Sequence, residues 1–124
     1  MSSRQTVLVV EDDSDTREMY TVALRMGGFD VKCASDGLSA LQQLDQETPA
    51  ALVLDLDLPC VSGLDVQDEL NAHRDTQTVP IVIVSGTEWP CATGVYARLN
   101  KPVSPDALVK VVQRAALSSR TDRH

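Results

Sequence analysis

A short apolar run that ends in a carboxylate constrains the fold of this chain more than any other stretch. Residues 52–54 read Leu-Val-Leu, Asp55 follows directly, and Pro59 prevents regular structure from continuing. A bounded apolar run of this length is typical of a strand buried on both faces, as in parallel sheets. In open α/β sheets, ligands bind outside the carboxyl ends of the strands. We therefore expect Asp55 to be held rigidly, and partly desolvated, at a ligand-binding edge.

Length and charge narrow the class of protein. The 124 residues predict a single domain, with a core over about residues 5–118 and a frayed polar tail over residues 119–124. A net charge of −7 argues against direct contact with nucleic acid or anionic lipid. No apolar run approaches the about 20 residues of a membrane span, and the N-terminus does not resemble a signal peptide. Three widely spaced cysteines predict reduced thiols and a cytoplasmic protein.

Strand and helix patterns alternate along the chain. Strands are predicted at residues 7–10, 29–33, 51–54, 81–84 and 96–100, and those at 7–10, 51–54 and 81–84 are expected to be buried. Helices are predicted after a cap at Asp13 or Ser14, from about residue 37, at residues 63–72, and after Ser104-Pro105-Asp106. Their apolar faces are predicted to hold Met19, Val22, Ala23 and Met26 in the first helix, Leu38, Leu41 and Leu44 in the second, and Leu108, Val111, Val112 and Ala115 in the last. Gly27-Gly28 is expected to end the first helix.

This alternation predicts an α/β fold, a doubly wound five-stranded parallel sheet of order 2-1-3-4-5. In that order the first and third strands are neighbours. Polar residues that are distant in sequence should then meet at one edge of the sheet, namely Glu11, Asp12, Asp55, Ser85 and Lys101.

Crowded carboxylates repel one another unless a cation joins them, and Mg²⁺ suits such an oxygen-rich set. With the metal bound, Asp55 would stay ionised and could attack phosphorus. Phosphoryl transfer then needs mainly alignment and charge neutralisation. Lys101 offers a point charge for one phosphoryl oxygen, and Ser85 offers a hydroxyl for another.

These residues resemble the receiver domains of two-component response regulators, which have a flavodoxin-like fold. The similarity rests on Glu11-Asp12, Asp55 with Pro59, Ser62-Gly63, Ser85-Gly86 and Lys101-Pro102, all in order and most at strand ends. The resemblance implies that Asp55 accepts a phosphoryl group from the phosphohistidine of a sensor histidine kinase or a phosphotransfer protein. It also implies that Asp12, Asp55 and the backbone carbonyl of Asp57 ligate Mg²⁺, and that Glu11 acts through water. Lys101 would form an ion pair with Asp55, and the peptide bond between Lys101 and Pro102 would be cis. The output would pass to a downstream protein partner.

The second half of the chain departs from the family pattern. Only residues 86–100 separate Ser85 from Lys101, which predicts a short or absent helix between the fourth and fifth strands. Arg98 occupies the position where receivers usually carry an aromatic switch residue. The resemblance further places Asp57 and Thr87 at positions that modulate the lifetime of the phosphorylated state.

Two other interpretations fit part of the pattern. Asp55-Leu56-Asp57 also resembles the nucleophile motif of haloacid-dehalogenase-type phosphatases, although it follows the third strand and not the first. A degenerate receiver that serves as an unphosphorylated scaffold is the other alternative. We expect a signalling switch and not an enzyme with turnover.

Overall fold

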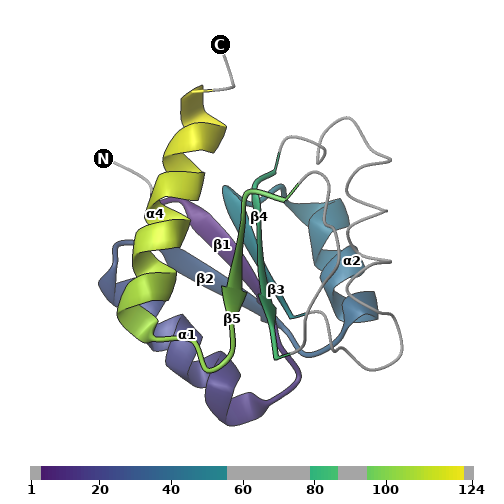
Figure 1. Ribbon diagram of the computed structural model, residues 1–124. Helices are drawn as coiled ribbons and strands as arrows, with labels where there is room; N and C mark the ends of the chain where they lie inside the picture. The colour runs from purple at the N-terminus through teal and green to yellow at the C-terminus, as the bar shows by residue number, and fades with distance from the viewer. Residues whose placement is uncertain (1–3, 56–78, 87–94, 122–124) are drawn as a thin grey trace.

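The computed structural model describes residues 4–55, 79–86 and 95–121. In these residues a five-stranded parallel sheet has the order β2-β1-β3-β4-β5, which confirms the predicted topology (Figure 1). The elements in chain order are β1 (Thr6–Val10), α1 (Ser14–Met26), β2 (Asp30–Ala34), α2 (Gly37–Gln46), β3 (Ala51–Asp55), β4 (Ile81–Ser85), β5 (Ala97–Asn100) and α4 (Pro105–Thr121). Every strand agrees with its predicted range to within one residue at each end.

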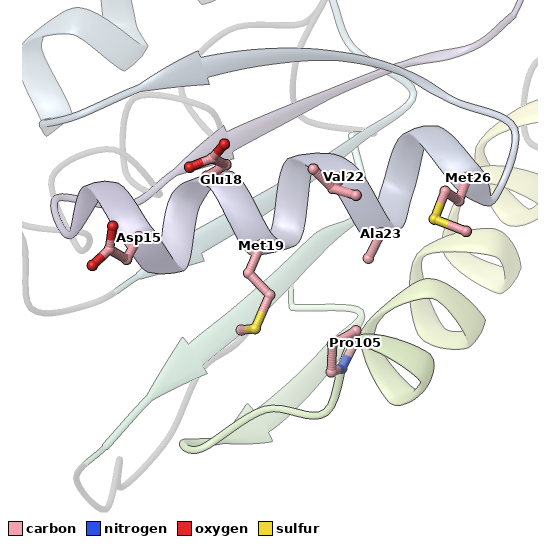
Figure 2. Close-up of a pocket in the computed structure, with 7 residues that line it drawn as sticks. All are labelled: Asp15, Glu18, Met19, Val22, Ala23, Met26 and Pro105. Atoms are coloured by element: carbon pink, nitrogen blue, oxygen red, sulfur yellow. The ribbon is translucent and has the colours of Figure 1, made fainter.

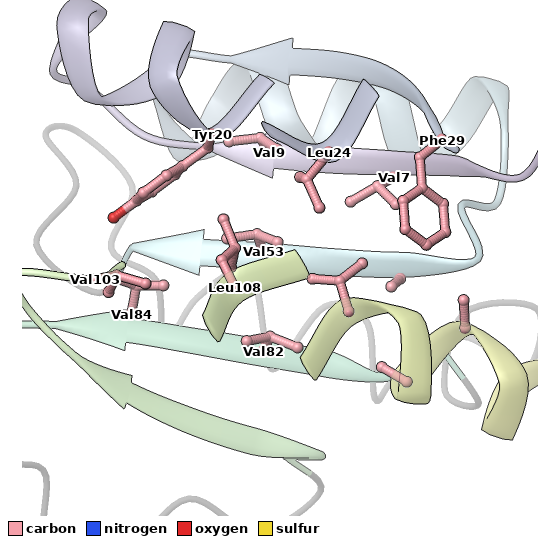
Figure 3. Packing of buried hydrophobic residues seen from close by; sticks show 14 residues of the cluster. Val7, Val9, Tyr20, Leu24, Phe29, Val53, Val82, Val84, Val103 and Leu108 are labelled. Atoms are coloured by element: carbon pink, nitrogen blue, oxygen red, sulfur yellow. The ribbon is translucent and has the colours of Figure 1, made fainter. Parts of the chain in front are cut away.

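Helices cover both faces of the sheet, with α1 and α4 on one face and α2 on the other (Figure 1). Successive strand side chains point to opposite faces, so the buried strands divide their residues between two cores. Val7, Val9, Val53 and Val82 pack with Tyr20, Leu24, Leu108 and Val112 of the helices α1 and α4 (Figure 3). Leu8, Val10, Leu52, Leu54 and Ile83 pack with Ala40 and Leu44 of α2. This two-sided burial explains the continuous apolar runs at residues 7–10 of β1, 51–54 of β3 and 81–84 of β4.

The predicted buried face of α1 was wrong. Tyr20 and Leu24 face the core, whereas Met19, Val22 and Met26 are exposed, Met26 to 84%. The helix carries apolar residues on two faces, and periodicity alone selected the one with more of them. Figure 2 shows this exposed face of α1, with Met19 lying toward Pro105 at the start of α4.

The other helix predictions held in part. Leu44 is buried but Leu38 of the predicted α2 face is 54% exposed, while Leu108, Val112 and Ala115 of α4 are fully buried. Helix α4 continues to Thr121, so the tail that was expected to begin at residue 119 starts as helix. Residues 119–124 contain no glycine or proline, the residues that commonly end a helix.

The caps of the helices α1 and α4 are those predicted from the sequence. Asp13 caps α1 by accepting a hydrogen bond from the Thr16 backbone N–H at 2.9 Å, and Gly28 leaves the helix at a positive φ of 102°. Ser104 caps α4 through the backbone N–H of Ala107. The predicted helix at residues 63–72, and most of the segment predicted to hold a short helix before β5, lie outside the described residues. No helix in the part of the chain that the structure describes is long and apolar enough to cross a membrane.

Candidate functional site

Four neighbouring strands deliver polar side chains to the carboxyl edge of the sheet. Asp55 is the last residue of β3 and Ser85 the last of β4, while Glu11 follows β1 and Lys101 follows β5. The register explains their meeting, because Val10 pairs with Leu54 and Ser85 with Asn100 in parallel alignment. The backbone N–H of Lys101 donates to the Ser85 carbonyl at 2.9 Å, which keeps the fifth strand attached at the site. The structure therefore brings together the residues that the predicted topology placed at one edge.

Lys101 is the cation of the cluster. Its Nζ lies 3.1 Å from Asp55 Oδ2 and 3.4 Å from Glu11 Oε1, so a single ammonium bridges two buried carboxylates. Partial burial lowers the pKa of Lys101, but the hydrogen bond to Asp55 and the charges of Asp55 and Glu11 outweigh it and raise the pKa overall. Lys101 is therefore fully protonated near neutral pH. The peptide bond between Lys101 and Pro102 is cis, as the receiver resemblance implied.

Burial and a neighbouring carboxylate disfavour the ionised form of Glu11. Its side chain is 2% exposed, and Oε2 is buried without a hydrogen-bond partner among the described residues. Burial first, and then the hydrogen bond and charge of Asp55, raise the pKa of Glu11 to about 8, against the opposing effect of Lys101. One ammonium is thus too little positive charge for this pair of carboxylates.

The acidic residues have the donor set of a hard divalent cation. Glu11, Asp12 and Asp55 each offer a carboxylate oxygen, and these oxygens lie within 4.8 Å of one another. Two are buried and Asp12 is exposed, so one side of the cluster opens to solvent. An unpartnered buried oxygen, all-oxygen donors and a raised Glu11 pKa all fit a bound cation that completes the charge balance.

The remaining predicted site residues are placed only in part. Ser85 is fully buried at the end of β4, and Arg98 is exposed on β5. Asp57 and Thr87 lie outside the described residues.

Two residues that the sequence analysis missed adjoin the site. The guanidinium of Arg17 donates to backbone carbonyls of the β1–α1 loop, and Tyr20 lines a groove next to Lys101. A basic residue one turn into the helix that follows the acidic pair was the available signal for Arg17.

Two grooves lead from the site along α1. A groove of about 360 Å³ is lined by Thr16, Met19, Tyr20, Lys101, Pro102 and Val103. A second groove of about 500 Å³ shares Met19 with it and continues over Val22, Ala23, Met26 and Pro105, with Asp15 and Glu18 also lining it (Figure 2). The exposed apolar face of α1 is therefore continuous with the neighbourhood of Lys101.

The family model of the response regulator receiver domain matches residues 7–113. The chain belongs to this family. The DNA-binding response regulator MtrA of Mycobacterium tuberculosis strain H37Rv is 37% identical over 128 residues, which cover 96% of this chain and 53% of MtrA. The chain thus spans about half the length of this relative. Membership confirms the receiver resemblance and gives no support to the haloacid-dehalogenase interpretation.

Solved structures of receivers agree with this placement. A putative response regulator from Chloroflexus aurantiacus J-10-fl aligns with a TM-score of 0.82 at 31% identity, covering 93% of this chain and 99% of that one. The chemotaxis response regulator CheY4 of Vibrio cholerae aligns with a TM-score of 0.84 at 24% identity, covering 91% and 99%, and shows the fold alone. The receiver therefore has the flavodoxin-like topology that was predicted.

Proposed function

We propose that the receiver is a phosphorylation switch in which Asp55 accepts a phosphoryl group from the phosphohistidine of a histidine kinase or phosphotransfer protein. The observation that carries this proposal is the buried Asp55 carboxylate, 3.1 Å from the Lys101 ammonium and within one cluster of oxygen donors. An oxygen of Asp55 attacks phosphorus, an acyl phosphate bond forms, and the phosphorus–nitrogen bond to the donor imidazole breaks. The electron pair stays on that nitrogen.

Residues of this chain align the reactants and neutralise charge. Lys101 holds one oxygen of Asp55 and offers its charge to the phosphoryl oxygens as they arrive. Ser85 is the last residue of β4, the strand paired with β3, and supplies a hydroxyl at the same edge of the sheet. Glu11, Asp12, Asp55 and the backbone carbonyl of Asp57 are the residues proposed to hold Mg²⁺, Glu11 through water. When bound, Mg²⁺ supplies positive charge that keeps the carboxylates ionised and shields the incoming phosphoryl group.

We propose that the protein donor docks on the apolar face of α1. Met19 belongs both to this face and to the groove that Lys101 lines, so a donor seated there lies next to the site. Asp15 and Glu18 beside the groove favour a donor with basic residues around its apolar contact. Exposure of Met19, Val22 and Met26 on one helix face is the feature that a docking partner would cover.

The output is proposed to be a change in protein contacts. The backbone carbonyl of Ser85 accepts a hydrogen bond from the Lys101 N–H, which links the site to the end of β5. Arg98 is exposed on that strand. Phosphorylation would shift Ser85 toward the phosphoryl group, and the surface around Arg98 would change with it. MtrA is named as a DNA-binding response regulator, and this chain matches about half of it. The net charge of −7 of this chain favours a protein as its partner.

The test is incubation of the purified chain with Mg²⁺ and acetyl phosphate, followed by intact-mass measurement. We expect one phosphoryl group on the wild type, none on Asp55→Asn, and an unchanged result for Asp106→Asn, which removes an exposed acid in the first turn of α4. A wild type that stays unmodified would establish the degenerate-scaffold alternative. Steady turnover of a phosphomonoester would instead establish a phosphatase.

A further inference from the structure

The side chain of Arg17 turns back from α1 onto the loop that carries the acidic pair. Its Nη1 donates to the carbonyl of Glu11 at 2.9 Å and, at a longer 3.5 Å, to the carbonyl of Asp12. We infer that Arg17 is a positioning residue of the cation site, which sets the backbone from which Glu11 and Asp12 present their carboxylates. This inference rests on the proposed function, because it assumes that the carboxylates hold a divalent cation.

The loop needs such a tether because the sheet stops supporting it at Glu11. The Glu11 N–H still donates to the Ala34 carbonyl at 3.0 Å, which extends the ladder between β1 and β2 by one residue. Helix α1 begins after Asp13, whose carbonyl accepts from the Arg17 N–H at 2.9 Å. Between these points lie the carbonyls of Glu11 and Asp12, and one guanidinium binds both. Asp12 is exposed, so packing does not hold its side chain, and its position follows that of its backbone.

Helix stability does not explain a cation at this place. Arg17 lies near the N-terminal end of α1, where the helix dipole disfavours positive charge. Arg25 in the last turn of the same helix has the favourable position. The helix dipole therefore does not account for the hydrogen bonds that Arg17 makes to the loop.

Charge and positioning predict opposite effects of removing Arg17 on cation binding. A guanidinium beside the site repels Mg²⁺, so its loss would tighten binding if only charge mattered. If Arg17 orders the ligands, its loss weakens binding, as the loss of groups that orient metal ligands commonly does, by 10- to 100-fold. The direction of the change thus separates the two effects.

The experiment is calorimetric titration of the metal-free full chain with Mg²⁺ at fixed pH and ionic strength. We expect the dissociation constant to rise about 10-fold in Arg17→Met and to stay within about twofold in Arg25→Met, which removes the same charge from the same helix. Arg17→Lys keeps a cationic hydrogen-bond donor but loses the planar guanidinium, and we expect its dissociation constant for Mg²⁺ to be intermediate. Thermal unfolding in EDTA accompanies each titration, and a purely structural role would lower the melting temperature without changing the dissociation constant.

Each outcome bears on the inference. Wild-type or tighter Mg²⁺ binding by folded Arg17→Met would overturn it, as would equal weakening in Arg25→Met. If Arg17→Met does not fold, Arg17→Lys decides, and wild-type affinity in that variant overturns the inference. Failure of the proposed cation site looks different: the wild type would then not bind Mg²⁺, or Asp12→Asn would bind it equally well.

Discussion

The buried carboxyl group of Glu11 makes the stability of the metal-free protein depend on pH. Its pKa is raised from 4.5 to about 8, first by burial and then by Asp55. Between these values the folded protein keeps a proton that the unfolded chain releases. The free energy of unfolding therefore falls as the pH rises from about 4.5 through about 8. At about 1.4 kcal/mol per pKa unit, the loss has an upper limit of about 5 kcal/mol.

The measurement is urea unfolding followed by circular dichroism, in EDTA, at several values between pH 5 and pH 9. We expect Glu11→Gln, which keeps the size of the side chain but cannot ionise, to remove most of the decline seen in the wild type. Glu47→Gln is the matched control. The hydrogen bond and charge of Lys32 lower the pKa of Glu47, so its contribution is lost only below its ordinary range, outside this window.

Saturating Mg²⁺ is expected to reverse the slope for the wild type. The cation binds ionised carboxylates, so it stabilises the folded state more as the pH rises. Parallel curves for the wild type and Glu11→Gln in EDTA would refute the burial argument. An unchanged slope on addition of Mg²⁺ would refute the link between Glu11 and the cation site.

Two further predictions concern the two faces of α1. Leu24→Ala is expected to cost about 2–5 kcal/mol, because Leu24 is fully buried between the helix and the sheet. Met26→Ala should change stability by less than about 0.5 kcal/mol, because Met26 is 84% exposed; similar losses for both in denaturant unfolding would contradict the observed orientation of α1. Val22→Lys should leave the melting temperature unchanged and slow phosphoryl transfer from a protein donor, but not from acetyl phosphate. Equal slowing with both donors would contradict docking on this face.

The sequence by itself predicted the sheet and the meeting of the site residues. Apolar runs of four residues buried on both faces are confined to the interior of a parallel sheet. Once the order 2-1-3-4-5 follows from the alternation of strands and helices, the residues after each strand must share one edge. Glu11, Asp55 and Lys101 could therefore be predicted as neighbours from positions up to 90 residues apart.

Only the tertiary structure decided which face of α1 is buried and how the site is balanced electrostatically. Met19, Val22 and Met26 satisfy the same helical period as Tyr20 and Leu24, and only packing against the sheet and α4 distinguishes the two faces. The raised pKa of Glu11 and the bonds from Arg17 to the loop depend on distances between groups. Periodicity describes one element at a time, whereas burial and charge are properties of several elements packed together.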